Sequence, residues 1–155
     1  MAFEIERKFL LANDSWKSYV VSSSHLVQAY ISHRHEGVVR LRIVDDAVAR
    51  LTIKGKTEGI QRHEWEYDIP VQDAHNMIAQ GVIEGDYIEK TRHTVEYDGF
   101  MWEIDVFHGR HEGLMLAEIE LPSADAPIAL PPFIGREVSH DPRYFNSALN
   151  RSSVP

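Results

Sequence analysis

Residues 3–9 read Phe3-Glu4-Ile5-Glu6-Arg7-Lys8-Phe9, a short stretch in which charged and apolar side chains largely alternate. Successive side chains of a β-strand point to opposite faces. As a strand, this stretch therefore carries Glu4, Glu6 and Lys8 on one face and a largely apolar surface on the other. The same two-residue alternation recurs in residues 38–44, 51–56, 62–69, 90–96, 102–106 and 115–121.

Short turn sequences separate these strands, which predicts antiparallel neighbours joined by hairpins. A further strand is predicted at about residues 25–33. Helical patterns occur at about residues 71–80 and 142–150, and residues 14–21 favour one more short helix. The predicted fold class is a β-rich α+β fold, a closed eight-stranded antiparallel β-barrel with a few short helices packed outside. No stretch reads as a linker, so residues 1–155 are predicted to form a single domain.

The composition is that of an ordinary globular chain, with 155 residues, 43% hydrophobic and 26% charged, and a formal net charge of -8. The acidic balance argues against nucleic acid as a partner, because nucleic-acid-binding proteins normally carry a basic excess. The absence of cysteine excludes disulfides, thiolate zinc sites and cysteine nucleophiles. The sequence shows no signal-peptide pattern and no run of roughly 20 apolar residues that would span a membrane. We therefore expect a soluble, cytoplasmic protein with no membrane partner.

The charged faces of the predicted strands bear ions at nearly every position. Their cations are Lys8, Arg40, Arg42, Lys54, Lys56, Arg62, Lys90 and Arg92, and their anions are Glu4, Glu6, Glu64, Glu66, Glu103, Asp105, Glu118 and Glu120. A charged sheet face commonly lies in water, and each strand taken alone fits that interpretation. The opposite faces are large and aromatic, however, which favours helices packed outside and charged faces turned into the barrel. Such an interior would be costly unless ions or ligands complete it.

The chemistry that suits such an interior is that of a polyanion with a divalent metal ion. Side chains two apart on a strand lie roughly 6–7 Å apart on one face, so Glu4 with Glu6, or Glu118 with Glu120, can share a hard cation. Mg²⁺ and Mn²⁺ prefer carboxylate oxygens, and arginine and lysine bind phosphate. A row of cations fits an extended phosphate chain, and metal-bound water is a strong nucleophile. The sequence therefore predicts hydrolysis of a phosphoanhydride.

The stretch from Glu4 to Lys8 resembles the Glu-x-Glu-x-Lys signature of the triphosphate tunnel metalloenzymes, also called the CYTH superfamily. Further motifs of that family follow in order: Tyr30, Arg40-Leu41-Arg42, Thr52-Ile53-Lys54, Glu64-Trp65-Glu66, Glu89-Lys90-Thr91-Arg92, residues 102–107, Ala117-Glu118-Ile119-Glu120, Glu137-Val138, Tyr144 and Asn146. The resemblance implies an eight-stranded antiparallel tunnel with a charged interior, and a C-terminal helix that can plug one end. It is strongest toward the short bacterial members that hydrolyse inorganic tripolyphosphate.

The resemblance also implies roles for individual residues. The triphosphate would be held by Lys8, Arg40, Arg42, Lys54, Lys90 and Arg92, joined by Arg62. Two divalent ions, Mg²⁺ or Mn²⁺, would be held by Glu4, Glu6, Glu118 and Glu120, with Glu64, Glu66 and Asp105 as further ligands or orienting acids. The predicted catalytic residues are Glu4, Glu6 and Lys8, and a metal-activated water would attack a terminal phosphorus.

Other functions stay open at this point. A class IV adenylate cyclase, or a nucleoside or thiamine triphosphatase, would share the fold, but the tight turns leave no evident segment for a base or a thiazolium. A non-catalytic polyphosphate or nucleotide sensor would need the cations but not the paired carboxylates. The sequence also leaves the oligomeric state open, a homodimer included.

Overall fold

The computed structural model describes residues 2–149, with side chains for residues 5–146, 148 and 149. Its strands are β1 (Ala2–Leu11), β2 (Val20–Arg34), β3 (Gly37–Val44), β4 (Val48–Gly55), β5 (Gln61–Ile69), β6 (Glu84–Tyr97), β7 (Phe100–Phe107), β8 (Met115–Glu120) and β9 (Ile134–Glu137). Its helices are α1 (Val71–Ala79) and α2 (Asn146–Leu149), with short 3₁₀ helices η1 (Ser15–Tyr19), η2 (Gly109–His111) and η3 (Pro142–Tyr144). Over this range no helix is both long enough and apolar enough to cross a membrane.

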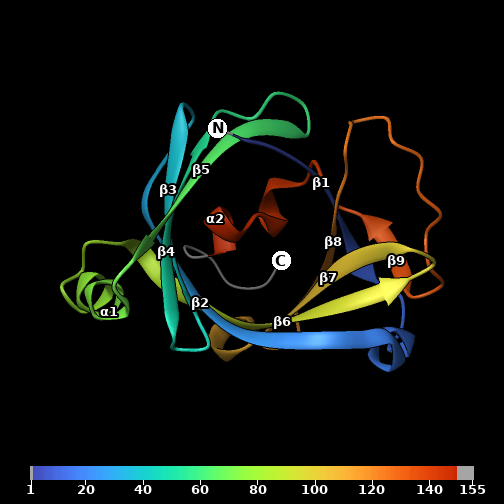
Figure 1. Ribbon diagram of the computed structural model, residues 1–155, viewed down its shortest axis with the longest axis horizontal. Helices are drawn as coiled ribbons and strands as arrows, with labels where there is room; N and C mark the ends of the chain where they lie inside the picture. The colour runs from blue at the N-terminus through green and yellow to red at the C-terminus, as the bar shows by residue number, and fades with distance from the viewer. Residues whose placement is uncertain (1, 150–155) are drawn as a thin grey trace.

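The nine strands of the described residues form one antiparallel sheet in the order β5-β4-β3-β2-β6-β7-β8-β1-β9. A further pairing joins β5 to β1, with Phe3 opposite His63 and Ile5 opposite Gln61, and it closes eight strands into a barrel. Figure 1 looks through this ring of strands, with α1 lying outside it. The predicted eight-stranded antiparallel barrel is therefore confirmed. The short strand β9 is an addition on the edge of β1 that the sequence pattern did not indicate.

The long strand β2 begins earlier than its sequence pattern predicts. The sequence predicts a strand at about residues 25–33, but the observed strand also includes three consecutive serines at 22–24. These serines pair with residues 92–94 of β6, so the neighbouring strand supplies the backbone partners that hold them extended. The helix predicted at residues 14–21 is shortened for the same reason, to the 3₁₀ helix η1.

The two other predicted helices have different outcomes. The pattern at residues 71–80 is confirmed by α1, which is followed by Gly81 in the left-handed region with φ 73°. The helix predicted at residues 142–150 is divided into η3 and α2, because Phe145 between them has an extended backbone with ψ 135°. Residue 150 lies outside the described residues.

The apolar outer surface of the barrel packs against segments that lie outside it. Trp102, Phe9 and Ile104 are buried there together with Trp16 of η1 and Phe133 of the segment before β9. The rings of Phe9 and Trp102 meet edge to face with 5.6 Å between their centroids. A second apolar cluster lies between α1 and the strands β3 and β4. The helices therefore cover the apolar faces, and the charged faces turn inward.

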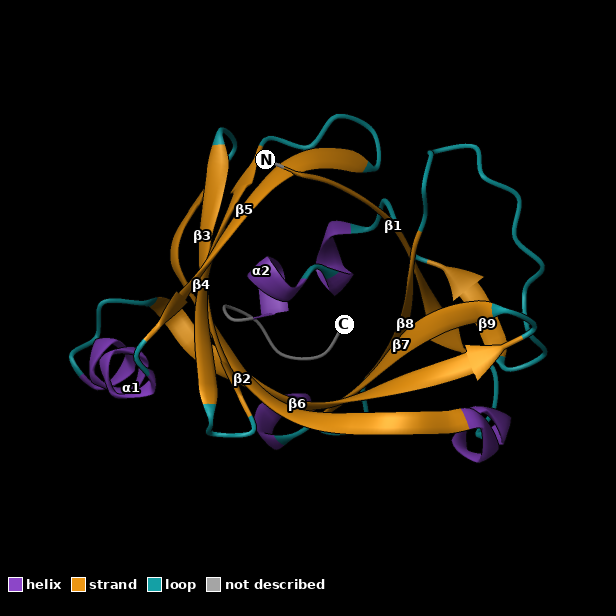
Figure 2. Cartoon of the chain, viewed as in Figure 1, coloured by secondary structure: helices purple, strands orange, loops and turns teal. Residues whose placement is uncertain are grey.

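One end of the barrel interior is apolar and contacts the C-terminal segment. The strands contribute Tyr30, Val38, Ile88, Phe107 and Leu116 to this apolar cluster. The segment after β9 contributes Val138, Tyr144 and Leu149. The carbonyl oxygen of Leu149 accepts hydrogen bonds from Arg110 and His111. Figure 2 shows α2 within the outline of the strand ring. Closure of this end by a C-terminal helix stays a prediction, since residues 150–155 lie outside the described part of the chain.

Trp102→Ala should lower the free energy of unfolding by about 3–5 kcal/mol, because it leaves a cavity beside Phe9 in the outer core. Trp102 is 0% exposed, whereas its neighbour Met101 on β7 is 50% exposed. Met101→Ala is therefore the matched control and should change stability by less than about 0.5 kcal/mol. Urea unfolding followed by circular dichroism measures both values. Similar losses in the two variants would contradict the burial difference on which this prediction depends.

Candidate active site in the barrel

The barrel holds a cavity of about 620 Å³ whose lining is rich in charged side chains. The predicted substrate-binding residues that line it are Lys8, Arg40, Arg42, Lys54, Arg62 and Arg92. The predicted metal ligands that line it are Glu6, Glu64, Glu66, Glu118 and Glu120. The structure thus brings together most of the residues that the sequence assigned to the site. The side chain of Glu4 lies outside the described residues, although its backbone belongs to β1.

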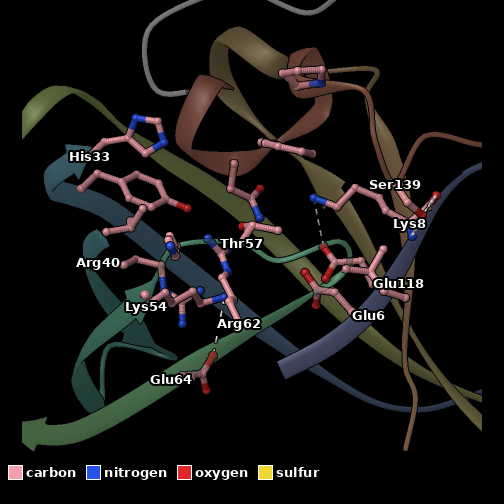
Figure 3. Close-up of a pocket in the computed structure, with 18 of the residues that line it drawn as sticks. Glu6, Lys8, His33, Arg40, Lys54, Thr57, Arg62, Glu64, Glu118 and Ser139 are labelled. Carbon is pink, nitrogen blue, oxygen red and sulfur yellow. Dashed lines mark hydrogen bonds and ion pairs between the residues drawn. The ribbon is translucent and has the colours of Figure 1, made fainter. Parts of the chain in front are cut away.

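The charges are unevenly divided between two sides of the cavity. In Figure 3, Lys8, Glu6 and Glu118 approach from one side, and Arg40, Lys54 and Arg62 approach from the other. We call the cations of β3, β4 and β5, namely Arg40, Arg42, Lys54 and Arg62, the cationic wall. We call the acids of β1, β7 and β8, namely Glu6, Glu103, Glu118 and Glu120, the carboxylate wall.

Strand register builds the carboxylate wall. On the neighbouring strands β1 and β8, Glu6 lies opposite Glu120 and Lys8 lies opposite Glu118. Strand β7 adds Glu103, which also lies opposite Glu118. Directly opposed residues of an antiparallel pair share a face, with Cβ atoms about 4.5–5.5 Å apart. Carboxylates from three strands therefore meet on one inner surface.

Lys8 stands beside the carboxylate wall and is buried with it. Its Nζ lies 3.5 Å from Oε1 of Glu118 and donates to the carbonyl oxygen of Tyr144 at 3.2 Å. Burial alone would lower the pKa of Lys8, but the negative charges of Glu118 and Glu6 outweigh it and raise that pKa. Burial alone would raise the pKa of Glu118, but Lys8 and Arg92 hold it well below its usual range. Both groups are therefore charged at neutral pH.

The cationic wall is held from behind by polar side chains. Nη2 of Arg40 donates to Oγ1 of Thr52 at 3.2 Å, and Thr52 in turn donates to Glu66 at 3.0 Å. Lys54 Nζ lies 3.5 Å from a carboxylate oxygen of Glu64. Within the described residues, the buried Nε of Arg40 has no hydrogen-bond partner. A buried donor of this kind needs an acceptor, and a phosphate oxygen in the cavity would supply one.

Lys90 and Asp105 lie behind the cavity surface instead of lining it. Lys90 Nζ is 2.7 Å from Oδ2 of Asp105, and the two side chains are 0% and 2% exposed. Arg92, which reaches the cavity, donates to both oxygens of Asp105 at 2.8 and 2.9 Å. Asp105 thus serves two cations at once. This geometry favours the orienting acid over the metal ligand for Asp105, and a supporting position for Lys90.

The pKa values of this ion cluster follow from its burial and its charges. Burial would raise the pKa of Asp105, but the charges of Arg92 and Lys90 and their hydrogen bonds hold it far below its usual range. Burial, helped by the neighbouring charges of Arg92 and Arg42, lowers the pKa of Lys90 to about 7, although Asp105 opposes this shift. The carboxylate of Asp105 therefore stays ionised under all ordinary conditions.

Some residues without a predicted role also contact the site: Gln28, Thr52, Glu103 and Phe145. Glu103 lines the cavity and pairs with Arg92 at 3.2 Å. Strand parity could have assigned Thr52 and Glu103, since they share strand faces with Lys54 and Asp105. Gln28 gives no such signal, because it is uncharged and lies on a strand whose register shifts nearby, between Tyr30 and Ser32.

The carboxylate wall suits a divalent cation by its chemistry. Glu6 faces Glu120 and Glu103 faces Glu118, and such like-charged pairs on neighbouring strands destabilise a sheet unless cations compensate them, as Lys8 does for Glu118 and Arg92 does for Glu103. Mg²⁺ and Mn²⁺ take carboxylate oxygens as ligands. Across the described side chains, no three acidic or histidine residues already stand close enough to form a metal cluster. The two-metal site stays a prediction.

Comparisons with known proteins agree with this geometry. Residues 2–147 match the CYTH domain family. The chain is 45% identical over 149 residues to an inorganic triphosphatase of Acetivibrio thermocellus, covering 96% of this chain and 94% of the relative. It is 35% identical over 149 residues to an inorganic triphosphatase of Nitrosomonas europaea, covering 94% of this chain and 95% of the relative. A crystal structure of an inorganic triphosphatase matches with a TM-score of 0.69 and 35% identity, covering 98% of this chain and 100% of that one.

The fold and the cavity together place this chain among proteins built as a closed antiparallel barrel with a charged interior. The chain belongs to the CYTH family, since the family match extends over nearly all described residues. The resemblance carried by Glu4-Ile5-Glu6-Arg7-Lys8 and the later motifs is therefore confirmed.

Asp105→Asn should lower the free energy of unfolding by about 3–5 kcal/mol, because it leaves Lys90 buried without its counter-ion and removes one of the two carboxylates that pair with Arg92. Glu103→Gln is the control, since Glu103 pairs with the same Arg92 at 3.2 Å but is 45% exposed. The control should lose less than about 1 kcal/mol. Urea denaturation at neutral pH compares the two variants. A loss in Asp105→Asn no larger than in the control would show that the buried cluster contributes no more than a surface ion pair.

Proposed function

We propose that this chain is a metal-dependent triphosphatase that hydrolyses inorganic tripolyphosphate to pyrophosphate and phosphate. The observation that carries the proposal is the cavity, which the cationic wall and the carboxylate wall line together, with Arg40, Lys54 and Arg62 on one side and Glu6 and Glu118 on the other. The relatives named inorganic triphosphatases match over nearly the whole chain and support the same substrate class. A small-molecule polyphosphate is the partner that suits a charged cavity of about 620 Å³ inside a barrel.

The cationic wall is proposed to hold the phosphate chain. Its arginines and lysine come from the three adjacent strands β3, β4 and β5, so their charges are spread along one inner surface. Guanidinium groups bind phosphate oxygens with two parallel N–H donors, and lysine adds a compact charge. Lys8 and Arg92 complete the clamp from the other strands. Lys90 is proposed to support Arg92 through Asp105 from behind the cavity surface.

The carboxylates are proposed to hold the metal. The ligands are Glu4, Glu6, Glu118 and Glu120, with Glu64 and Glu66 as further ligands, and this number of acids suits two ions. When bound, Mg²⁺ or Mn²⁺ would neutralise charge on the phosphate oxygens and lower the pKa of a water that becomes the nucleophile.

The proposed catalytic residues are Glu4, Glu6 and Lys8, all from strand β1. The carboxylates of Glu4 and Glu6 would accept hydrogen bonds from the attacking water and orient it toward the terminal phosphorus. The ammonium group of Lys8 lies beside Glu118, where it would stabilise negative charge that develops on the phosphoryl oxygens. No protein nucleophile takes part, so the proposed reaction is a direct transfer of the phosphoryl group to water.

Phosphate release tests the proposed function directly. The purified chain is incubated with tripolyphosphate, ATP, thiamine triphosphate and pyrophosphate, each with Mg²⁺, with Mn²⁺ and with a chelator. We expect fast release from tripolyphosphate that requires the metal and stops with the chelator. Cyclic AMP formed from ATP would instead establish a cyclase. Tight binding of tripolyphosphate without turnover would indicate a sensor.

Glu6→Gln should lower kcat for tripolyphosphate by about 100-fold or more, because it removes a negative charge that is proposed to hold the metal and to orient the attacking water. The affinity for the substrate should fall much less, since the cationic wall is intact. Arg42→Ala should have the opposite profile, raising KM by about tenfold through the loss of a charged hydrogen-bond donor.

Steady-state kinetics and calorimetric titration with tripolyphosphate separate these two effects. Glu96→Gln is the matched control, because Glu96 is an exposed glutamate of β6 outside the cavity lining. Its kinetic constants should equal those of the unchanged protein. Full activity in Glu6→Gln would show that the proposed position of the metal and the water is wrong.

A further inference from the structure

Gln28 is a fully buried polar residue in the barrel wall that the proposed mechanism does not use. It lies on β2 directly opposite Arg42 of β3, and its side chain is 0% exposed. Its Oε1 accepts two hydrogen bonds from the Arg42 guanidinium, from Nε at 3.1 Å and from Nη2 at 2.9 Å. Arg42 lines the cavity, whereas Gln28, beside it on the neighbouring strand, does not.

Arg42 needs such an anchor because its surroundings do not favour its charge. Burial, together with the neighbouring charges of Arg40 and Arg92, lowers the pKa of Arg42 to about 9. Like charges on flexible side chains move apart when nothing holds them. An amide oxygen supplies a fixed acceptor without adding a negative charge that would repel a polyphosphate.

The hydrogen bonds engage one edge of the guanidinium group and leave the other edge free of Gln28. Nε and Nη2 point to the same oxygen, so the N–H groups of Nη1 face away from it. A planar fork held along one edge presents its remaining donors in a defined direction, which is what bidentate binding of a phosphate requires.

The second polar atom of Gln28 supports this assignment. Among the described residues, its Nε2 is buried and has no hydrogen-bond partner. An unsatisfied buried amide group destabilises a fold, so an aliphatic side chain of similar size would be more favourable for packing alone. The hydrogen bonds that its oxygen accepts from Arg42 explain why this position holds a glutamine.

We infer that Gln28 is a positioning residue that holds Arg42 in the orientation in which its free edge grips a phosphate of the substrate. This inference rests on the proposed function, because it assigns Arg42 to the substrate clamp. It adds a neutral side chain to a site that is otherwise built from ions.

The first test compares variants of Gln28 that differ in the acceptor. Gln28→Met keeps the length of the side chain but removes the oxygen, and it should raise KM for tripolyphosphate about tenfold with kcat changed less than about threefold. Gln28→Asn keeps the amide group but shortens the side chain by one methylene, which moves the oxygen away from Arg42. Its KM should therefore rise as in Gln28→Met.

A double-mutant cycle distinguishes positioning from a purely structural role. In an Arg42→Met background, Gln28→Met should change KM no further, because there is no guanidinium left to position. A packing role would give the same loss in both backgrounds, and that outcome would overturn the inference. An unchanged KM in folded Gln28→Met and Gln28→Asn would overturn it as well.

Failure of the proposed function has a different signature. If the unchanged protein binds tripolyphosphate without releasing phosphate, the triphosphatase proposal is wrong, and the cycle is then measured by calorimetric affinity. Coupling between positions 28 and 42 in that affinity would still support the role of Gln28. Independent effects of the two substitutions would reject it.

Discussion

Strands β1 and β5 lie at opposite ends of the row of eight strands, and their pairing closes that row into a barrel. As an open sheet, the same strands could place their charged face in water at little cost. Closure instead directs cations and carboxylates from many strands into one cavity of about 620 Å³. Each charge enclosed in this way needs a partner in the barrel or in a ligand, since an unpaired buried charge is strongly unfavourable.

The enclosed charges divide by how they are compensated. Asp105 neutralises Lys90 and Arg92 within the protein, and this cluster is almost completely buried. The cationic wall is compensated less fully, as the unpartnered Nε of Arg40 among the described residues indicates. The first group stabilises the barrel wall, and the second is the one proposed to bind the anionic substrate. The same type of residue therefore serves the fold at one position and the proposed reaction at another.

Most of the fold could be predicted from local patterns. The alternation in residues 3–9 and its repeats identified seven of the eight strands that make the barrel, and α1 followed from its own periodicity. The sequence patterns missed β9 and the early start of β2 at the serines 22–24, because neither segment alternates. Both are extended because a neighbouring strand supplies backbone partners, which is information from distant parts of the chain.

The sequence by itself determined which face each charged side chain occupies, because the two-residue period of a strand is a local property. It thereby identified nearly all the lysine, arginine and glutamate residues that line the cavity, from Glu6 and Lys8 on β1 to Glu118 and Glu120 on β8. Only the tertiary structure decided which of these charges meet. Register between β1 and β8, which are far apart in sequence, sets Lys8 opposite Glu118. Pairing across the β6–β7 and β2–β3 hairpins buries Asp105 between two cations and sets Gln28 beside Arg42, and the alternation within a single strand contains none of these registers.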